Sequence, residues 1–132
     1  MKRMEDKLPR KTEKPWGYEL LFAHTPKYAG KVIFVKKGHR LSLQYHEKKD
    51  ETMYIYQGKL LLEIEKGGQM VQSEVGPGNS IPIRPNTKHR IQAIEDTFVF
   101  EVSTAELDDV VRVEDDYGRA GPRKAYGKEH SA

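Results

Sequence analysis

Hydrophobic and polar residues alternate along most of the chain, between Trp16 and Val113, with a period of two far more often than the period of about 3.6 that a helix requires. Each alternating run is short and is followed by Gly, Pro, Asn or Asp. No stretch has the pattern of an amphipathic helix of ordinary length. The pattern predicts strands at Tyr18–His24, Lys31–Lys36, Leu41–His46, Thr52–Gln57, Lys59–Glu65, Met70–Val75, Ser80–Ile83, His89–Ile94 and Thr97–Ser103.

Many short strands at this spacing are typical of an antiparallel barrel or sandwich. Turn-forming segments separate the strands, among them Gln57-Gly58-Lys59, Gly76-Pro77-Gly78 and Arg84-Pro85-Asn86. In the strand expected at Lys59–Glu65, the apolar side chains at every second position are expected to point inward and the glutamates outward. We therefore predict an all-β fold, a β-barrel of the jelly-roll kind.

The chain has 132 residues, which suits one domain, and it contains no cysteine. The absence of cysteine excludes disulfides, thiolate metal ligands and cysteine nucleophiles. Any metal ion must therefore be held by histidine, carboxylate or amide groups.

Positive charge is concentrated at the two ends of the chain. Residues 1–14 carry six basic and three acidic groups, residues 118–132 carry four and one, and residues 15–117 carry thirteen and sixteen. We interpret residues 1–14 and 118–132 as flexible basic tails around a β-barrel domain at residues 15–117. Because such tails are usually solvated, we expect no nucleic-acid partner.

The sequence has no candidate for a membrane anchor. No apolar run approaches the roughly 20 residues of a membrane helix, and Met1–Lys14 lacks the apolar stretch of a signal peptide. We therefore expect a cytoplasmic protein without a membrane partner.

Several side chains that can bind a metal fall close together in the predicted strands. Gln44 and His46 are two residues apart, so they project from one face of a strand together with Ser42. Glu51 follows a charged turn, and a hairpin can bring it opposite that pair. His89 begins a later strand. Two imidazoles, a carboxylate and an amide oxygen suit one divalent metal ion (Zn, Mn, Co, Ni or Fe) and leave room for water or substrate.

The spacing of these residues resembles the two motifs of the cupin superfamily. The first motif corresponds to Gly38-x5-Gln44-x-His46-x4-Glu51-x6-Gly58, with Gln in place of the usual first His. The second corresponds to Gly78-x5-Arg84-x-Asn86-x2-His89. The resemblance implies a small β-barrel in which one divalent metal ion is held by Gln44, His46, Glu51 and His89.

A closer resemblance is to the cupin domain of type II mannose-6-phosphate isomerases, which often forms the C-terminal part of bifunctional enzymes that also carry a mannose-1-phosphate guanylyltransferase. The segments that carry it are Lys14–Glu19, Gly38–His46 and Val111–Arg119. It covers about residues 14–119 and implies aldose–ketose isomerisation of a sugar phosphate.

The chain departs from that family's usual pattern at a few positions. Thr52-Met53 stands where members usually have His-Trp. Arg84 and Asn86 stand where they usually have Pro and Gly, although Asn can adopt the left-handed conformation that Gly supplies there. Arg84 would place a fixed positive charge near the metal.

An isomerase of this kind needs a base and a group that binds phosphate. The candidate bases are Glu101 and Lys49, although Glu101 alternates with apolar residues and could instead point to solvent. Arg119, in the matching Tyr-Gly-Arg segment, is the first choice for the phosphate, because an arginine fork pairs two phosphate oxygens. Further candidates for substrate binding are Arg40, Arg84, Lys31, Trp16 and Tyr18.

Two other functions stay open at this point. One is a non-catalytic cupin that binds a sugar or small acid with its metal ion. The other is an iron-dependent, oxygen-using cupin, which Gln44 disfavours because most such sites use three imidazoles. We also expect a homodimer that pairs through an edge strand at Tyr18–His24, where Leu20, Leu21 and Phe22 are apolar.

Overall fold

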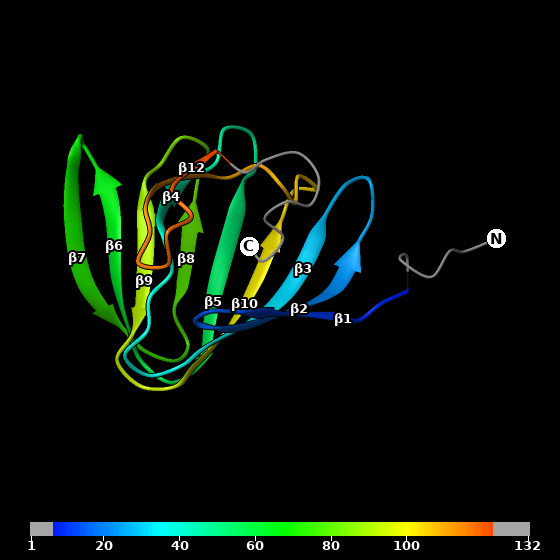
Figure 1. Cartoon of the computed structure of the whole chain (residues 1–132), viewed down its shortest axis with the longest axis horizontal. Coiled ribbons are helices and arrows are strands. Elements are labelled where there is room, and N and C mark those ends of the chain that lie inside the picture. Colours follow the sequence, from blue (N-terminus) through cyan, green and yellow to red (C-terminus); the bar gives the residue numbers. More distant parts are fainter. Residues whose placement is uncertain (1–6, 123–132) are drawn as a thin grey trace.

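The structure, a computed structural model, describes residues 7–122 and places two six-stranded antiparallel sheets face to face (Figure 1). The first sheet has the strand order β1 (Arg10–Lys14), β2 (Gly17–His24), β3 (Ala29–Val35), β10 (Thr97–Ser103), β5 (Glu51–Gln57) and β8 (Ser80–Ile83). The second has the order β12 (Gly121–Pro122), β11 (Val111–Glu114), β4 (Leu43–Tyr45), β9 (His89–Ala93), β6 (Leu60–Lys66) and β7 (Gln69–Val75). The described residues form no helix, which confirms the all-β prediction.

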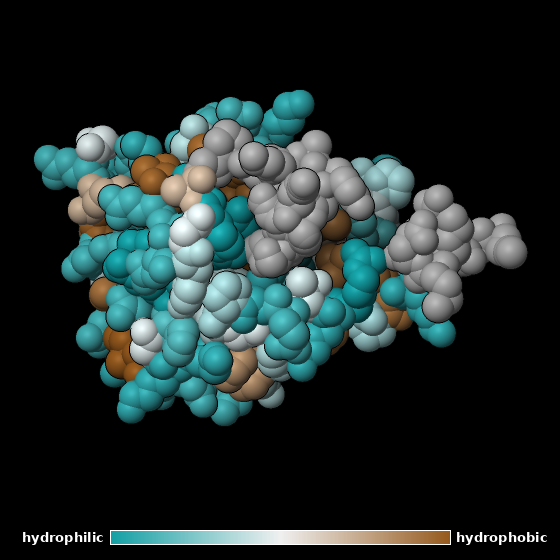
Figure 2. Space-filling model, viewed as in Figure 1, coloured by the Kyte–Doolittle hydropathy of each residue, from teal (hydrophilic) through white to brown (hydrophobic). Residues whose placement is uncertain are grey.

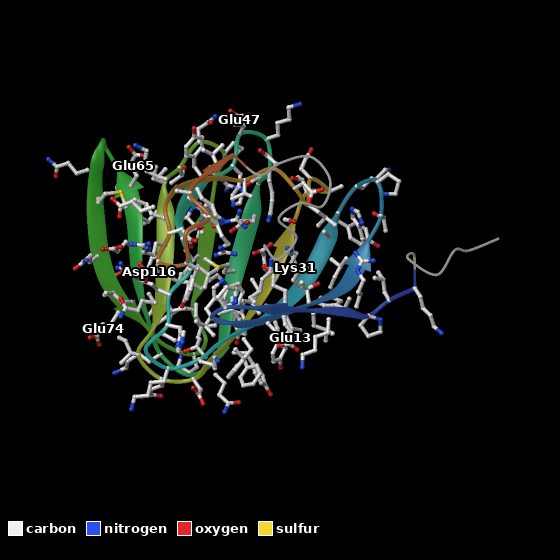
Figure 3. All side chains as sticks on the ribbon, viewed as in Figure 1. Glu13, Lys31, Glu47, Glu65, Glu74 and Asp116 are labelled. Carbon is white, nitrogen blue, oxygen red and sulfur yellow. The ribbon has the colours of Figure 1, made fainter. Side chains whose placement is uncertain are left out.

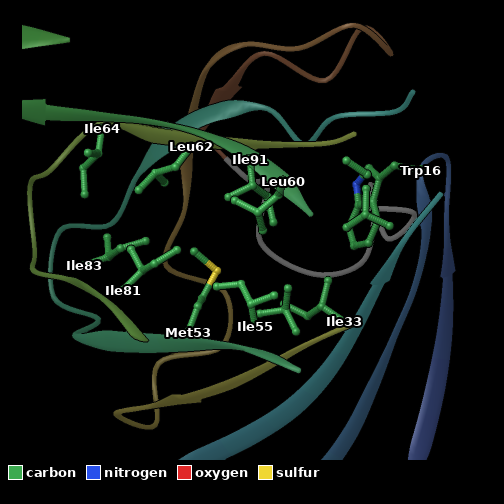
Figure 4. Close-up of a cluster of buried hydrophobic side chains, with 13 residues drawn as sticks. Trp16, Ile33, Met53, Ile55, Leu60, Leu62, Ile64, Ile81, Ile83 and Ile91 are labelled. Atoms are coloured by element: carbon green, nitrogen blue, oxygen red, sulfur yellow. The ribbon is translucent and has the colours of Figure 1, made fainter. Parts of the chain in front are cut away.

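The core lies between the two sheets, toward the end of the molecule that carries β6 and β8. Figure 4 shows apolar side chains of the second sheet facing those of the first across this space. Along β6 the buried positions are Leu60, Leu62 and Ile64, and the glutamates between them are more exposed, as the alternation predicts. From the first sheet, the core receives Ile33, Val35, Met53, Ile55, Ile81, Ile83 and Val99.

The two sheets remain separate, so the jelly roll has the form of a sandwich rather than a closed cylinder. In Figure 1 the β6–β7 hairpin lies at one end of the molecule and the β1–β2 hairpin at the other. The surface seen in Figure 2 is mainly hydrophilic, with its apolar residues in separated areas. No described segment forms a helix that could cross a membrane, and the cytoplasmic location stays a prediction.

The sheets extend beyond the domain limits that the sequence suggests. Arg10–Lys14, expected in the N-terminal tail, forms β1 and pairs along β2. Gly121–Pro122, expected in the C-terminal tail, pairs with β11 as β12. The hydrophobic pattern misses β1 because its side chains are polar and mostly exposed, and it misses β12 because two residues are too few to show an alternation. The other expected tail residues, 1–6 and 123–132, lie outside the described residues.

Strand β2 is not an edge strand, so the expected pairing of two copies through Tyr18–His24 is wrong in its location. β1 covers the outer side of β2, and Leu21 is buried inside the sandwich. The polar β1 is the edge of the first sheet. The homodimer itself stays a prediction.

Gly17, at the start of β2, is fixed by a close approach of two strands. Its φ is +154°, and a Cβ there would collide with the backbone carbonyl of Phe34 on β3. Gly68, in the turn between β6 and β7, also has a positive φ of +80°, but a Cβ there would meet nothing within 4 Å. A comparison of alanine substitutions at Gly17 and Gly68 therefore distinguishes the effect of a steric collision from the effect of a positive φ alone.

We expect Gly17→Ala to lower the free energy of unfolding by at least about 2 kcal/mol more than Gly68→Ala, because only the first substitution forces β2 and β3 apart. Urea unfolding followed by circular dichroism measures the difference. Equal destabilisation by the two substitutions would contradict the close approach at Gly17.

Candidate metal centre and its cavity

Three buried side chains converge between the sheets: His46, which follows β4, Glu51 at the start of β5, and His89 at the start of β9. The Nε2 atom of His46 lies 3.5 Å from Oε1 of Glu51, and Nε2 of His89 lies 3.8 Å from Oε2. One possible ligand atom from each residue lies within 4.8 Å of the others. The sequence-predicted residues His46, Glu51 and His89 therefore meet in one cluster.

The backbone around the cluster explains why these segments meet. Asn86 has a φ of +61° and donates its backbone N–H to the carbonyl of His46 at 2.6 Å. The left-handed conformation expected of Asn86 is confirmed, and it turns the chain just before β9. Across the second sheet, Gln44 is the register partner of His89, so their side chains project from the same face.

Both imidazole rings are oriented by backbone carbonyls. Nδ1 of His46 lies 2.5 Å from the carbonyl oxygen of Asp109, and Nδ1 of His89 lies 2.9 Å from that of Thr87. A carbonyl oxygen only accepts hydrogen bonds, so each Nδ1 carries a proton and each Nε2 is directed toward Glu51. This arrangement is typical of histidines that bind metal ions through Nε2.

Burial and, to a smaller extent, the nearby charge of Lys49 together lower the pKa of the His46 imidazole to about 4. The ring is therefore neutral at neutral pH, which is the form that ligates a metal ion.

Two atoms of the cluster lack the hydrogen bond that buried polar atoms normally have. Among the described residues, Nε2 of His46 and Oε1 of Glu51 are buried without a hydrogen bond, although Oε1 has an ionic contact with Nζ of Lys49. Two neutral imidazole nitrogens and a carboxylate are suitable donors for a divalent transition-metal ion. The residues present thus fit the expected metal ion, and its identity among Zn, Mn, Co, Ni and Fe stays open.

Gln44, the fourth expected ligand, lines the same cavity as Glu51 and His89. Its Oε1 accepts a hydrogen bond of 2.6 Å from the hydroxyl of Ser42, which is almost fully buried. An amide oxygen has a second lone pair, so the hydrogen bond orients Gln44 without removing its capacity to bind a metal ion.

Asp109, which the sequence reasoning missed, organises the turn between His46 and Glu51. Its carboxylate accepts hydrogen bonds from the backbone N–H groups of Glu47, Lys48 and Lys49, at 2.6 to 3.1 Å. Burial alone would raise the pKa of Asp109, but these three donors outweigh it and lower the pKa below its usual value. No local pattern marks this residue, because it lies more than sixty positions away from the turn along the chain.

The two candidate bases contact each other beside the cluster. Nζ of Lys49 lies 3.2 Å from Oε1 of Glu51 and 3.1 Å from Oε2 of Glu101, and all three side chains are buried. Glu101 therefore points inward rather than to solvent. Burial would lower the pKa of Lys49, but the charges of Glu101 and Glu51 outweigh it and raise the pKa above its usual range. Lys49 keeps its proton, so Glu101 is the better candidate for a base.

Three expected substrate-binding residues lie outside the cavity. Arg40 forms a forked pair with Asp116, at 2.7 and 2.8 Å. Arg84 is exposed, pairs with Asp50 at 2.9 Å, and lines an outer groove to which Glu51 also contributes. Tyr18 packs on the ring of Phe34 instead of lining the cavity. Nearby aspartates and an aromatic neighbour hold these three side chains outside the main cavity, and their role in substrate binding stays a prediction.

The other candidates do line the cavity. Trp16 contributes from the core and is 2% exposed. Lys31, which lies near the middle of the molecule in Figure 3, pairs with Glu19 at 3.0 Å. Arg119 forms a forked pair with Asp115 at 3.0 and 3.1 Å. Three charged lining residues were not singled out from the sequence: Lys14, Glu19 and Arg112.

The fold and the cluster together define a cupin. A model of the family described as "Mannose-6-phosphate isomerase C-terminal" matches residues 1–115, and the chain belongs to that family. The resemblance inferred from the motifs is thereby confirmed. A search of curated proteins finds no match.

Solved structures support the same fold. KdgF from Halomonas sp. is 25% identical with a TM-score of 0.62, over 69% of this chain and 80% of that chain. An arginine-to-alanine mutant of Bacillus subtilis oxalate decarboxylase OxdC is 19% identical with a TM-score of 0.71, over 80% of this chain and 30% of that one. CapF with the inhibitor 3-isopropenyl-tropolone is 19% identical with a TM-score of 0.68, over 80% of this chain and 34% of that one. Another structure of the oxalate decarboxylase is described by its Mn(II) centers.

We expect His89→Ala and Glu51→Gln each to lower the bound divalent metal at least about tenfold, because each removes one of three convergent donors. Elemental analysis of protein that has been loaded with metal and desalted measures the content. The matched control is His24→Ala, which removes an exposed histidine of β2. Full metal occupancy in both site variants would contradict the assignment.

The Lys31–Glu19 pair gives a prediction about acid stability. Burial raises the pKa of Glu19, but Lys31 and Lys14 outweigh it and lower the pKa to about 2. The stabilisation from ionised Glu19 is therefore complete above its ordinary pKa and is lost as the pH falls toward 2. We expect Lys31→Met to destabilise the protein by about 3 kcal/mol at pH 7 and to move acid unfolding to higher pH.

Circular dichroism along an acid titration measures this midpoint. The control Lys11→Met removes an exposed lysine that pairs with Glu13, and it should change stability by less than about 1 kcal/mol. An acid midpoint for Lys31→Met equal to that of the wild type would contradict the role of the buried pair.

Proposed function

We propose that this protein is a metal-dependent isomerase that interconverts an aldose phosphate and a ketose phosphate. The observation that carries the proposal is the buried carboxylate of Glu101, which Lys49 links to the His46–Glu51–His89 cluster. A base beside a site that can hold a divalent ion is the combination that this reaction needs. Membership of the mannose-6-phosphate isomerase C-terminal family supports a sugar phosphate as substrate.

In the proposed reaction, the Glu101 carboxylate accepts the proton from the hydroxyl-bearing carbon next to the sugar carbonyl and returns it to the carbonyl carbon. The hydroxyl proton of the first carbon moves to the former carbonyl oxygen, so the carbonyl and hydroxyl groups exchange positions. No proton is gained or lost overall. A divalent ion held by His46, Glu51 and His89, with Gln44 as a fourth ligand, would supply electrostatic stabilisation of the negative charge that develops on the sugar oxygens.

Lys49 has a positioning role in this proposal. Its ammonium group lies between the carboxylates of Glu51 and Glu101 and holds both side chains in place. The low polarity around these buried groups strengthens each of these interactions relative to water.

The substrate enters from the side of the cavity that β1, β2 and β3 line. Trp16 provides an apolar wall there, and Lys31 and Arg119 provide positive charge for the phosphate. Arg40 and Arg84 have no place in the proposal, because each pairs with an aspartate outside the cavity.

We expect Glu101→Gln to lower kcat for the interconversion of mannose 6-phosphate and fructose 6-phosphate by about 10² to 10⁴, because it removes the base and leaves the shape of the side chain. A coupled assay with metal-loaded protein measures the rate, and elemental analysis checks that the variant keeps its metal. The matched control is Glu74→Gln on β7, an exposed carboxylate far from the cluster in sequence and outside the cavity lining.

A wild-type protein that binds its metal and the sugar phosphate but converts neither sugar would refute the isomerase and favour the non-catalytic binding cupin. Full activity of Glu101→Gln would refute the assignment of the base. Consumption of oxygen by the iron-loaded protein would instead favour the oxygen-using cupin.

A further inference from the structure

The outer face of the first sheet, on the side away from the core, is apolar across four neighbouring strands. Along β10 the buried positions alternate with Phe98, Phe100 and Val102, which point outward, and Phe100 and Val102 are exposed. An antiparallel sheet usually presents polar side chains on a face that meets water. The fold itself does not require these exposed apolar groups, so they call for a partner.

The strand register places the outward side chains in rows that cross the sheet. In the central row, Leu20 of β2, Val32 of β3, Phe100 of β10 and Tyr54 of β5 are successive register partners. The Phe100 ring stacks on the rings of Tyr54 and Tyr56, with centroids 6.5 and 5.2 Å apart. The stacked rings support one another, so the row presents an ordered surface in the single copy.

The row on one side of the centre is also aromatic and ends at a polar rim. Tyr18, Phe34 and Phe98 are register partners, and successive ring centroids lie 5.3 and 4.8 Å apart. On β1, Nζ of Lys11 lies 4.3 Å from the centroid of the Tyr18 ring and pairs with Glu13. Charged groups therefore begin where the apolar rows end.

The row on the other side contains Phe22, Gly30 and Val102. A Cβ at Gly30 would meet the Phe22 ring at 2.7 Å, so the glycine makes room for the ring against the sheet. This row borders the outer groove in which Arg84 pairs with Asp50. None of the three rows contains a charged residue, although 33% of the whole chain is charged.

The area of this face suits a stable protein interface. Four strands about 4.8 Å apart, each with about seven residues of about 3.3 Å, cover roughly 450 Å² in projection, and a specific interface needs about 500 Å² from each partner. The relief of the side chains and the polar rim add to the projected area. Monomeric soluble proteins rarely leave an apolar patch of this size uncovered.

A second copy of the chain suits this face by its charge and by its shape. An uncharged face meets its own copy without like-charge repulsion, and a two-fold axis brings the same patch of both copies together. An apolar centre with a polar rim is the usual anatomy of a protein interface. Sheets pack face to face about 10 Å apart through apolar side chains of this kind. A peptide or a sugar chain would need more hydrogen-bonding groups than the tyrosine hydroxyls that the rows offer.

We propose that the outer face of β2, β3, β10 and β5, centred on Phe100, is the interface of a homodimer in which two copies pack sheet against sheet about a two-fold axis. The proposal goes beyond the isomerase reaction and needs no metal ion or substrate. Leu20 and Phe22, expected at a pairing edge, take part through their side chains rather than through backbone hydrogen bonds.

Size-exclusion chromatography with light scattering measures the molar mass of the full chain in solution. One copy has a mass of 15.2 kDa, and we expect the wild type at about 50 μM to have twice this mass. Phe100→Arg should raise the dissociation constant of the dimer by at least about a hundredfold and give a monomer, because it places a charge from each copy at the centre of the interface.

The matched control is Met70→Arg on β7 of the second sheet. Met70 is 44% exposed and Phe100 is 38% exposed, so the two substitutions change similar surfaces, and Met70→Arg should remain a dimer. Val102→Arg is a second interface variant that should also be a monomer. Val102 is 57% exposed, so this arginine leaves the core undisturbed. Circular dichroism and urea unfolding check that each variant is folded.

A monomeric wild type at this concentration would overturn the proposal. A dimer that survives both Phe100→Arg and Val102→Arg would also overturn it, because that dimer must use another surface. A monomeric wild type that floats with phosphatidylcholine vesicles, and loses this property in Phe100→Arg, would identify a lipid surface as the occupant instead. The masses are measured without turnover, so a protein that forms this dimer but does not isomerise the sugar refutes the proposed function alone.

Discussion

The buried carboxylate of Glu51 is the constraint on which the site depends. A carboxylate that is removed from water needs opposite charge or hydrogen-bond donors around it, and for Glu51 the opposite charge is the ammonium of Lys49, while the imidazoles of His46 and His89 lie on two other sides. Glu51 belongs to the first sheet, whereas His89 belongs to the second, so the same contacts join the two sheets at this point. The buried ammonium of Lys49 is stabilised in turn by the carboxylate of Glu101, so each buried charge lies next to a charge of opposite sign.

The space between the sheets is divided into two parts by this arrangement. Toward β6 and β8 it is filled with Leu, Ile, Val and Met side chains, whose burial stabilises the fold. Toward β1, β3 and β11 it is lined by charged groups that stabilise nothing by burial alone. The apolar part supplies the stability that allows the charged part to exist. A bound metal ion and a bound anion would each lower the cost of that second part.

The sequence predicts the parts of this structure that depend on local patterns. Period-two alternation locates nine of the twelve strands of the sandwich and misses β1, β11 and β12. Motif spacing identifies His46, Glu51 and His89. Both signals lie within short segments. The alternation does not predict that Glu101 points inward. In this part of the interior the buried side chain is charged, and its apolar neighbours Phe100 and Val102 are exposed. The contact of Asp109 with the turn at Lys48 joins segments distant in the chain. Arginines give no local signal at all: Arg40 and Arg112 look alike in sequence, but one pairs with an exposed Asp116 and the other is buried.

The positions at which the chain departs from its family's usual motifs bear on whether the site can be catalytic. Arg84 is exposed and pairs with Asp50, away from the metal-ligand cluster. Asn86 keeps the left-handed backbone that a Gly would have there, so the hydrogen bond from its N–H to His46 is retained. Met53 is buried in the apolar core and also lines the cavity that Gln44, Glu51 and His89 share, whereas Thr52 faces the outer groove that Arg84 also lines. None of these substitutions removes a donor from the cluster or from Glu101. The departures therefore change the outer surface, the core packing and one apolar wall of the cavity, and they leave in place every group that the proposed reaction uses.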